Sequence, residues 1–277
     1  MCPFINIGEF IQIPTYSACF IIGFAFTLWL TCFICKKEGN ASRHVLYSSL
    51  YALIGIGLGA KLMYFISKIP GFIRHWDAFV EALQTDFWGL MDYAFGGLVF
   101  YGGLLGAIFG YWIYSKQFKV HINFILDNTV AYFPLLHAFG RIGCFLGGCC
   151  YGMEYYGPLA IQFPYNELEP ALNAFPRFPV QLVEATGNII LFIVLFTLRK
   201  KHKLMPKSLL GLYLVVYAVM RTCLEFVRGD LVRGAVWVFT TSQWISLILL
   251  PVGIFLMVKN RMPKADTNQA DDVGDSK

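Results

Sequence analysis

Seven long apolar stretches constrain this chain more than any other feature. They cover residues 13–35, 46–66, 93–114, 124–146, 179–198, 208–227 and 242–258. Each is close to the roughly 20 residues that a helix needs to cross a hydrocarbon core of about 30 Å. Only 14% of the residues are charged, against about a quarter in soluble proteins. Because backbone polar groups must be satisfied internally in lipid, the pattern predicts an all-α polytopic membrane protein with seven transmembrane helices.

The basic residues predict the orientation of these helices. Alternate connections carry 13 lysines and arginines on one side and five on the other. The richer side is cytoplasmic by the positive-inside rule, so the N-terminus is expected outside and the C-terminus inside. The net charge of +5 then reflects topology. Nucleic acid is not expected as a partner.

The remaining segments are expected to belong to one membrane domain, residues 1–264. Residues 67–92 contain Trp76 and Trp88 among acidic residues, which is typical of an outward interfacial arm. Residues 152–178, between the fourth and fifth helices, are too rich in proline for a long helix and are expected to form a small outward-facing head. The first apolar stretch is too long for a signal-peptide core, so we expect a retained helix. Residues 265–277 are expected to form a disordered cytoplasmic tail.

Ionisable residues within the apolar stretches are candidate functional residues, because charges at membrane depth are costly. Arg141 follows His137 by one helical turn, and its neighbouring sequence offers no acid before Glu154. A permanently charged arginine among glycines suggests a phosphate or another anion at membrane depth. His137 is either a general base beside that arginine or a hydrogen-bonded packing residue. Lys61, near the outward end of its helix, can snorkel to the interface.

A second charged group lies in the sixth stretch. Arg221 and Glu225 are four residues apart, so they can pair or share a ligand, and Arg228 extends the same helical face. The alternative is a neutralised ion pair that only helps helices pack.

Glycines and polar residues supply further candidates. Gly102 and Gly103 follow Tyr101 in the third stretch, where small residues allow close helix packing or expose a cavity wall. Gln181 and Glu184 follow Pro179 at the start of the fifth stretch and add a polar face.

The eight cysteines predict neither disulfides nor a metal site. Several lie inside apolar stretches, where cysteine commonly serves as a small hydrophobe. Cys144, Cys149 and Cys150 do not match paired CxxC zinc spacing. Neither a metal nor another cofactor is therefore expected. Cys149-Cys150 as a lipid-carrying nucleophile or a redox pair is a weaker alternative.

Five ordered features resemble the prolipoprotein diacylglyceryl transferase family of bacterial inner membranes. They are Tyr16 at the start of the first helix, Phe100-Tyr101-Gly102-Gly103, the Gly140-Arg141-Ile142-Gly143 block that ends in Gly152, Pro179 with Gln181 and Glu184, and Arg221 with Glu225 and Arg228. The resemblance implies a multi-pass inner-membrane enzyme. Such an enzyme moves the diacylglyceryl group of phosphatidylglycerol to the lipobox cysteine of secreted prolipoprotein signal peptides and releases glycerol phosphate.

The resemblance also implies residue roles. Arg141 and Arg221 would hold the lipid phosphate, and Glu225 would orient Arg221. Tyr101, His137 and Glu225 join the two arginines as candidate catalytic residues. Candidate substrate-binding residues share the glycine-rich or polar motifs named above: Tyr16, Gly102, Gly103, Gly140, Gly143, Gly152, Gln181, Glu184 and Arg228.

Four positions depart from the family's usual pattern. Tyr101 stands where many members carry histidine, and Cys144, Gly147 and Cys149 stand where asparagines and a glutamate are usual. His137 is then the nearest substitute base, or the acceptor thiol deprotonates with help from the phosphate or Tyr101. Two other functions remain open: a related transferase with a different acceptor, and an anion transporter or lipid-binding membrane protein. Transporters often carry internal repeats, and none is visible here.

Overall fold

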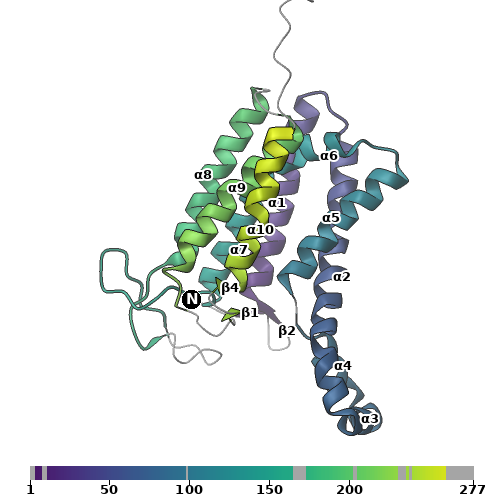
Figure 1. Ribbon diagram of the computed structural model, residues 1–277, viewed down its shortest axis with the longest axis vertical. Coiled ribbons are helices and arrows are strands. Elements are labelled where there is room, and N and C mark those ends of the chain that lie inside the picture. Colours follow the sequence, from purple (N-terminus) through teal and green to yellow (C-terminus); the bar gives the residue numbers. More distant parts are fainter. Residues whose placement is uncertain are drawn as a thin grey trace, which may run out of the picture. The chain divides into compact units, whose positions relative to one another are not determined.

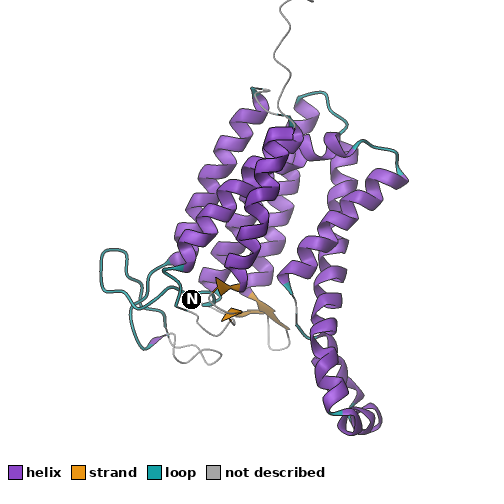
Figure 2. Cartoon of the chain, in the orientation of Figure 1, coloured by secondary structure: helices purple, strands orange, loops and turns teal. Residues whose placement is uncertain are grey.

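The computed structural model describes residues 4–7, 11–97, 99–164, 173–201, 205–229, 235–236 and 239–259. Helices dominate this part of the chain (Figures 1 and 2). The chain divides into two compact units. One comprises Met1–Trp29 with Thr129–Lys277, and the other comprises Leu30–Asn128.

The first unit holds the candidate site. Its main helices are the first part of α1 (Thr15–Lys37), α7 (Phe133–Leu146), α8 (Val180–Lys200), α9 (Pro206–Glu225) and α10 (Thr241–Lys259). Helix α8 packs against α7 and α9, and α9 packs against α10 (Figure 1). Leucines 191, 195 and 209 are buried between them. The buried sides of α7, α8 and α9 therefore face one interior.

The second unit is built on one close helix pair. It contains α2 (Ser42–Arg74), α3 (Trp76–Thr85), α4 (Phe87–Phe95), α5 (Phe100–Gln117) and most of α6 (Ile122–Thr129). A Cβ atom on Gly106 would collide with the carbonyl oxygen of Gly55, and one on Gly102 with that of Gly59. The backbones of α2 and α5 thus touch where both lack side chains. This packing accounts for Gly102 without a ligand.

Six described helices are long and apolar enough to cross a membrane: α1, α2, α6 with α7, α8, α9 and α10. Their outer faces expose large apolar residues such as Ile21, Leu58 and Ile190, as expected for sides that face lipid. The third expected span corresponds to α5, which is not among the six. Four glycines and a polar end at Ser115-Lys116-Gln117 lower its mean hydropathy. A polytopic helical membrane protein is confirmed, and the count of seven stays a prediction.

The fourth expected span is interrupted. Helix α6 ends at Thr129, a 3₁₀ turn η1 covers Val130–Tyr132, and α7 starts at Phe133 with Pro134 in its first turn. Proline suits a first helical turn but breaks a continuous helix, because it has no N–H to donate. The apolar pattern did not predict this interruption, since it reports burial and not backbone hydrogen bonding.

The 67–92 arm is helical, and the structure adds a hydrogen bond of Lys61 and two hairpins to what the sequence predicted. Helix α2 continues through Pro70 to Arg74, and α3 and α4 follow, with Trp76 and Trp88 largely exposed. The Lys61 ammonium, expected to snorkel, donates to the backbone oxygen of Phe95. Two short hairpins were not predicted: β1 (Phe4–Ile7) pairs with β2 (Ile11–Pro14), and β3 (Ala235–Val236) pairs with β4 (Phe239–Thr240). Residues 265–277 lie outside the described residues.

The segment from 152 to 178 packs onto the end of α9. Gly152 forms an antiparallel bridge with Arg228, and Arg177 bridges both Glu154 and Ile161. Tyr151 and Phe163 form a small hydrophobic core, against which Phe145 and Ile161 pack. Residues 165–172 of this segment are outside the described residues.

Candidate functional site

Helices α7 and α8 bring three polar side chains together. His137 and Arg141 lie one turn apart on α7, and Glu184 lies near the start of α8. The Nε atom of Arg141 is 2.9 Å from Oε1 of Glu184, and Nε2 of His137 is 3.7 Å from the same oxygen. Glu184 is only 1% exposed. Arg141 therefore has a counter-ion, Glu184 of the next helix, that its neighbouring sequence did not reveal.

A second ion pair lies at the end of α9. Nη2 of Arg221 is 2.8 Å from Oε2 of Glu225 and donates a 2.7 Å hydrogen bond to the hydroxyl of Ser242 on α10. Nε of Arg228 is 3.9 Å from the same Glu225 oxygen. Glu225 thus lies between two arginines, as the four-residue and three-residue spacings predicted.

The two ion pairs share neighbours. His137 is close enough to both Arg141 and Arg221 to interact with their charges. Tyr217, one turn before Arg221 on α9, interacts with both arginines and with Glu184, and its ring centroid is 4.9 Å from that of His137. The two pairs therefore form one polar cluster inside the first unit.

This cluster has unused hydrogen-bonding capacity and an excess of positive charge. Among the residues that the structure describes, buried Nε of Arg141 and Nη1 of Arg221 have no hydrogen-bond acceptor, and Oε1 of Glu184 and Oε2 of Glu225 have no hydrogen-bond donor. The 2.9 Å Arg141–Glu184 contact is an ion pair whose N–H is not aligned with the carboxylate. Arg141, Arg221 and Arg228 carry three positive charges, and Glu184 and Glu225 carry two negative ones. With His137 neutral, the net charge of the cluster is +1, which one added negative charge would balance.

The glycines of the motif divide into two kinds. A Cβ on Gly140 would meet nothing within 4 Å, so no described residue fills the space beside it. A Cβ on Gly143 would lie 2.9 Å from Cβ of Cys19 and 3.3 Å from Cα of Tyr16, so Gly143 lets α7 approach α1. A Cβ on Gly152 would collide with the carbonyl oxygen of Phe178. Packing thus accounts for Gly143 and Gly152 and leaves Gly140 unexplained.

The remaining predicted residues fall into two groups. Tyr16 starts α1 within electrostatic range of Arg141, and buried Gln181 donates a 2.8 Å hydrogen bond to the carbonyl of Cys149. Tyr101, Gly102 and Gly103 lie in the second unit, at the start of α5. Their participation in the cluster stays a prediction.

Sequence reasoning missed three residues that contact the cluster. Tyr217 could have been found from its position four residues before Arg221. Asn188 follows Glu184 by one turn, is fully buried and donates 2.9 Å to the Glu184 carbonyl. Ser242 lies on another helix, and no local pattern indicated its contact with Arg221.

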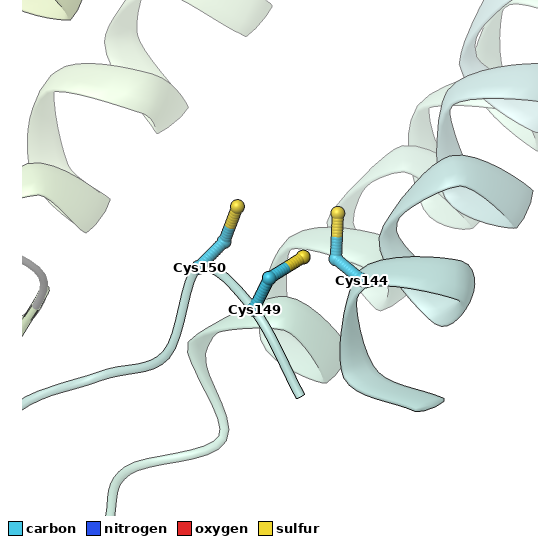
Figure 3. A group of neighbouring side chains, drawn as sticks. All are labelled: Cys144, Cys149 and Cys150. Carbon is cyan, nitrogen blue, oxygen red and sulfur yellow. The ribbon is translucent and has the colours of Figure 1, made fainter. Parts of the chain in front are cut away.

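Three cysteines come together just beyond Arg141. The Sγ atoms of Cys144, Cys149 and Cys150 all lie within 4.8 Å of one another. Figure 3 shows Cys144 at the end of α7 and the other two on the following loop, with the Cys149 sulfur directed toward Cys144. None of the seven described cysteines is in a disulfide. The sequence spacing gave no reason to expect this cluster, because a tight turn at Gly147-Gly148 creates it.

Comparison with known proteins identifies the family. The family model described as prolipoprotein diacylglyceryl transferase matches residues 3–259. The chain is 31% identical over 255 residues to the phosphatidylglycerol-prolipoprotein diacylglyceryl transferase of Clostridium tetani, covering 92% of this chain and 96% of the relative. The corresponding enzyme 2 of Clostridium perfringens is 30% identical over 260 residues, with 93% and 96% covered. That of Chlorobaculum tepidum is 30% identical over 276 residues, with 96% and 93% covered. The chain belongs to the prolipoprotein diacylglyceryl transferase family.

Proposed function

We propose that this protein transfers the diacylglyceryl group of phosphatidylglycerol to the cysteine thiol of a secreted prolipoprotein. The family and the relatives' names support this reaction. The observation that carries it is the polar cluster, in which two buried guanidinium groups each keep an N–H without an acceptor. The phosphodiester of phosphatidylglycerol is a monoanion with two free oxygens, so it supplies both the missing acceptors and the missing charge.

The cluster suits the chemistry of this transfer. The acceptor sulfur attacks the carbon that joins the diacylglyceryl group to the phosphodiester. The bond between that carbon and the phosphate oxygen breaks, and glycerol phosphate leaves with the electron pair. Negative charge then grows on the departing phosphate. Arg141 and Arg221, fixed by Glu184, Glu225 and Ser242, would stabilise that charge without reorganising.

Other residues would bind or position the substrates. The open space beside Gly140 would admit the glycerol backbone close to α7. Tyr16 would contact the donor from the start of α1, and Gln181 would hold the Cys149 loop. Arg228 would attract the anionic headgroup. His137, which lies beside both arginines, is the proposed general base for the acceptor thiol.

The proposed topology has seven spans, with α5 as the third. Residues 1–264 would form one membrane domain, with the arm of residues 67–92, the head of residues 152–178 and the N-terminus outside the bacterial inner membrane, and residues 265–277 inside. The distribution of basic residues supports this orientation. Labelling of single cysteines at positions 88, 156 and 201 with an impermeant reagent would check it. Labelling from outside is expected at the first two positions and not at the third.

The direct test uses purified protein, phosphatidylglycerol and a lipobox peptide. We expect the peptide mass to increase by one diacylglyceryl group and glycerol phosphate to appear in equal amount. A peptide with serine in place of the acceptor cysteine is the matched control. If the purified protein binds phosphatidylglycerol but modifies no cysteine peptide, the transferase proposal is wrong, and a different acceptor or a lipid-binding function takes its place.

A further inference from the structure

We propose that Cys144, Cys149 and Cys150 bind one Zn²⁺ ion and leave its fourth coordination position open for the acceptor thiol. The binding of zinc rests on the geometry of the three thiols alone. The occupant of the fourth position rests on the function proposed above.

The three sulfur atoms fit one coordination sphere. Tetrahedral zinc binds thiolates at about 2.3 Å, which places two bound sulfurs about 3.8 Å apart. The three Sγ atoms lie within 4.8 Å of one another, so small side-chain rotations bring all of them to bonding distance. Three protein ligands with one open position are typical of catalytic zinc, whereas structural zinc has four protein ligands.

The backbone holds the three cysteines in this arrangement. The amide of Cys149 donates 3.0 Å to the carbonyl of Cys144, and Gln181 donates 2.8 Å to the carbonyl of Cys149. Gly148 has φ +71° and Cys150 has φ +57°. A left-handed conformation is uncommon for cysteine, and here it accompanies a Cys150 sulfur that lies within 4.8 Å of the other two. The cluster is thus part of an ordered turn with its own hydrogen bonds.

The surrounding charge suits a zinc–thiolate centre. Zn²⁺ with three thiolates carries one negative charge, and the Arg141 guanidinium is within electrostatic range of Cys144 and Cys150. Cys144 and Cys150 are buried, and Cys149 is the most exposed of the three. A fourth ligand would therefore approach from the more exposed Cys149 side.

The metal would convert the acceptor thiol into the thiolate that the reaction needs. A cysteine thiol is mostly protonated near neutral pH, and coordination to zinc deprotonates it. The acceptor R–SH binds as R–S⁻, and its proton passes to the base proposed above. The sulfur then forms a bond to the glycerol carbon while the carbon–oxygen bond breaks toward phosphate. The product thioether carries no negative charge and leaves the metal, whose oxidation state does not change.

Metal analysis tests the binding site independently of catalysis. We expect about one zinc per full-length chain in purified protein and a decrease of about tenfold in the Cys149→Ser/Cys150→Ser variant. Cys32→Ser, which changes a partly buried cysteine of the second unit, is the matched control and should keep its zinc. Thermal unfolding in detergent shows whether each variant is folded. Zinc absent from folded wild-type protein, or retained by the double variant, would overturn the proposal.

Cobalt substitution tests the fourth position without requiring turnover. Protein stripped with a chelator and loaded with Co²⁺ should show thiolate-to-metal charge-transfer absorption. A lipobox peptide with its cysteine should increase that absorption, and the serine peptide should not. An identical spectrum with both peptides would overturn the role of the acceptor thiol.

The two proposals fail in different ways. If wild-type protein transfers diacylglycerol but the stripped form is equally active, the zinc inference is wrong and the function stands. If zinc binds and the cysteine peptide changes the cobalt spectrum but no transfer occurs, the transferase function is wrong and the metal site stands. Loss of transfer on stripping, with recovery on adding Zn²⁺, supports both.

Discussion

Arg141 of α7 and Glu184 of α8 form an ion pair in the interior of the first unit, with 2.9 Å between Nε and Oε1. The Glu184 side chain is 2% exposed and the Arg141 side chain 15% exposed. A buried pair of this kind contributes little compared with apolar packing, but the loss of one partner leaves an uncompensated charge. The pair therefore both fixes Arg141 and makes the site sensitive to substitution.

Glu184→Gln should destabilise the protein by about 3 to 5 kcal/mol and reduce diacylglyceryl transfer by at least about tenfold, because Arg141 loses its counter-ion. Chemical unfolding in detergent and product formation measure the two effects. Glu154→Gln is the control, since Glu154 is exposed and accepts a hydrogen bond from the Tyr156 hydroxyl in the 152–178 segment. Equal stability of the two variants would contradict the role given to Glu184.

Arg221→Lys should reduce transfer by about tenfold or more while the fold is retained. Lysine keeps the charge but lacks the planar fork of N–H groups with which arginine can contact Glu225, Ser242 and a phosphate at once. Ser242→Ala removes one hydrogen bond of 2.7 Å and should have a smaller effect, about 1 kcal/mol. Turnover with phosphatidylglycerol in mixed micelles provides the comparison. Full activity in Arg221→Lys would show that Arg221 acts as a point charge only.

His137→Ala should abolish transfer and leave the protein folded if His137 is the base. The imidazole lies 3.7 Å from Glu184 and beside Tyr217, so a packing role predicts loss of stability instead. Melting temperature and turnover, measured across pH, separate the two roles. Near-normal turnover in a folded variant would remove His137 from the mechanism.

Gly140→Ala should fold normally but transfer more slowly, because the added methyl enters the space proposed for the lipid. Gly143→Ala should instead destabilise the fold. Its methyl would press on Cys19 and Tyr16 at the α7–α1 contact, and overpacking typically costs about 1 to 3 kcal/mol. A Michaelis analysis with phosphatidylglycerol, alongside unfolding measurements, distinguishes the pair. Normal kinetics in Gly140→Ala would place the lipid elsewhere.

Gly106→Ala should destabilise the second unit by about 1 to 3 kcal/mol, since its methyl would meet the Gly55 carbonyl on α2. Gly57→Ala on α2 meets nothing within 4 Å and should be neutral or slightly stabilising. Thermal unfolding of both variants in the same detergent measures this difference in stability. The same rank order is expected in lipid nanodiscs.

The sequence by itself determined the class of protein and the chemistry of its charged residues. The free energy of moving a segment into lipid depends on the composition of about 20 consecutive residues, so apolar stretches predict membrane helices without information on which helices pack together. The pairing of Arg221 with Glu225 was also local, because residues four apart share a helical face. The requirement of Arg141 for an anionic partner was evident from its position in an apolar stretch.

Only the tertiary structure decided which groups meet. Glu184 reaches Arg141 because of how α7 and α8 are rotated against each other, and no local spacing encodes that rotation. The same is true of Gly102 against Gly59, where contact between two helices and not a ligand explains the glycine. The three thiols converge because the turn at Gly147-Gly148 folds the chain back onto the end of α7. A side chain's type and helical phase can be read along the chain, but its partner depends on the packing of the whole bundle.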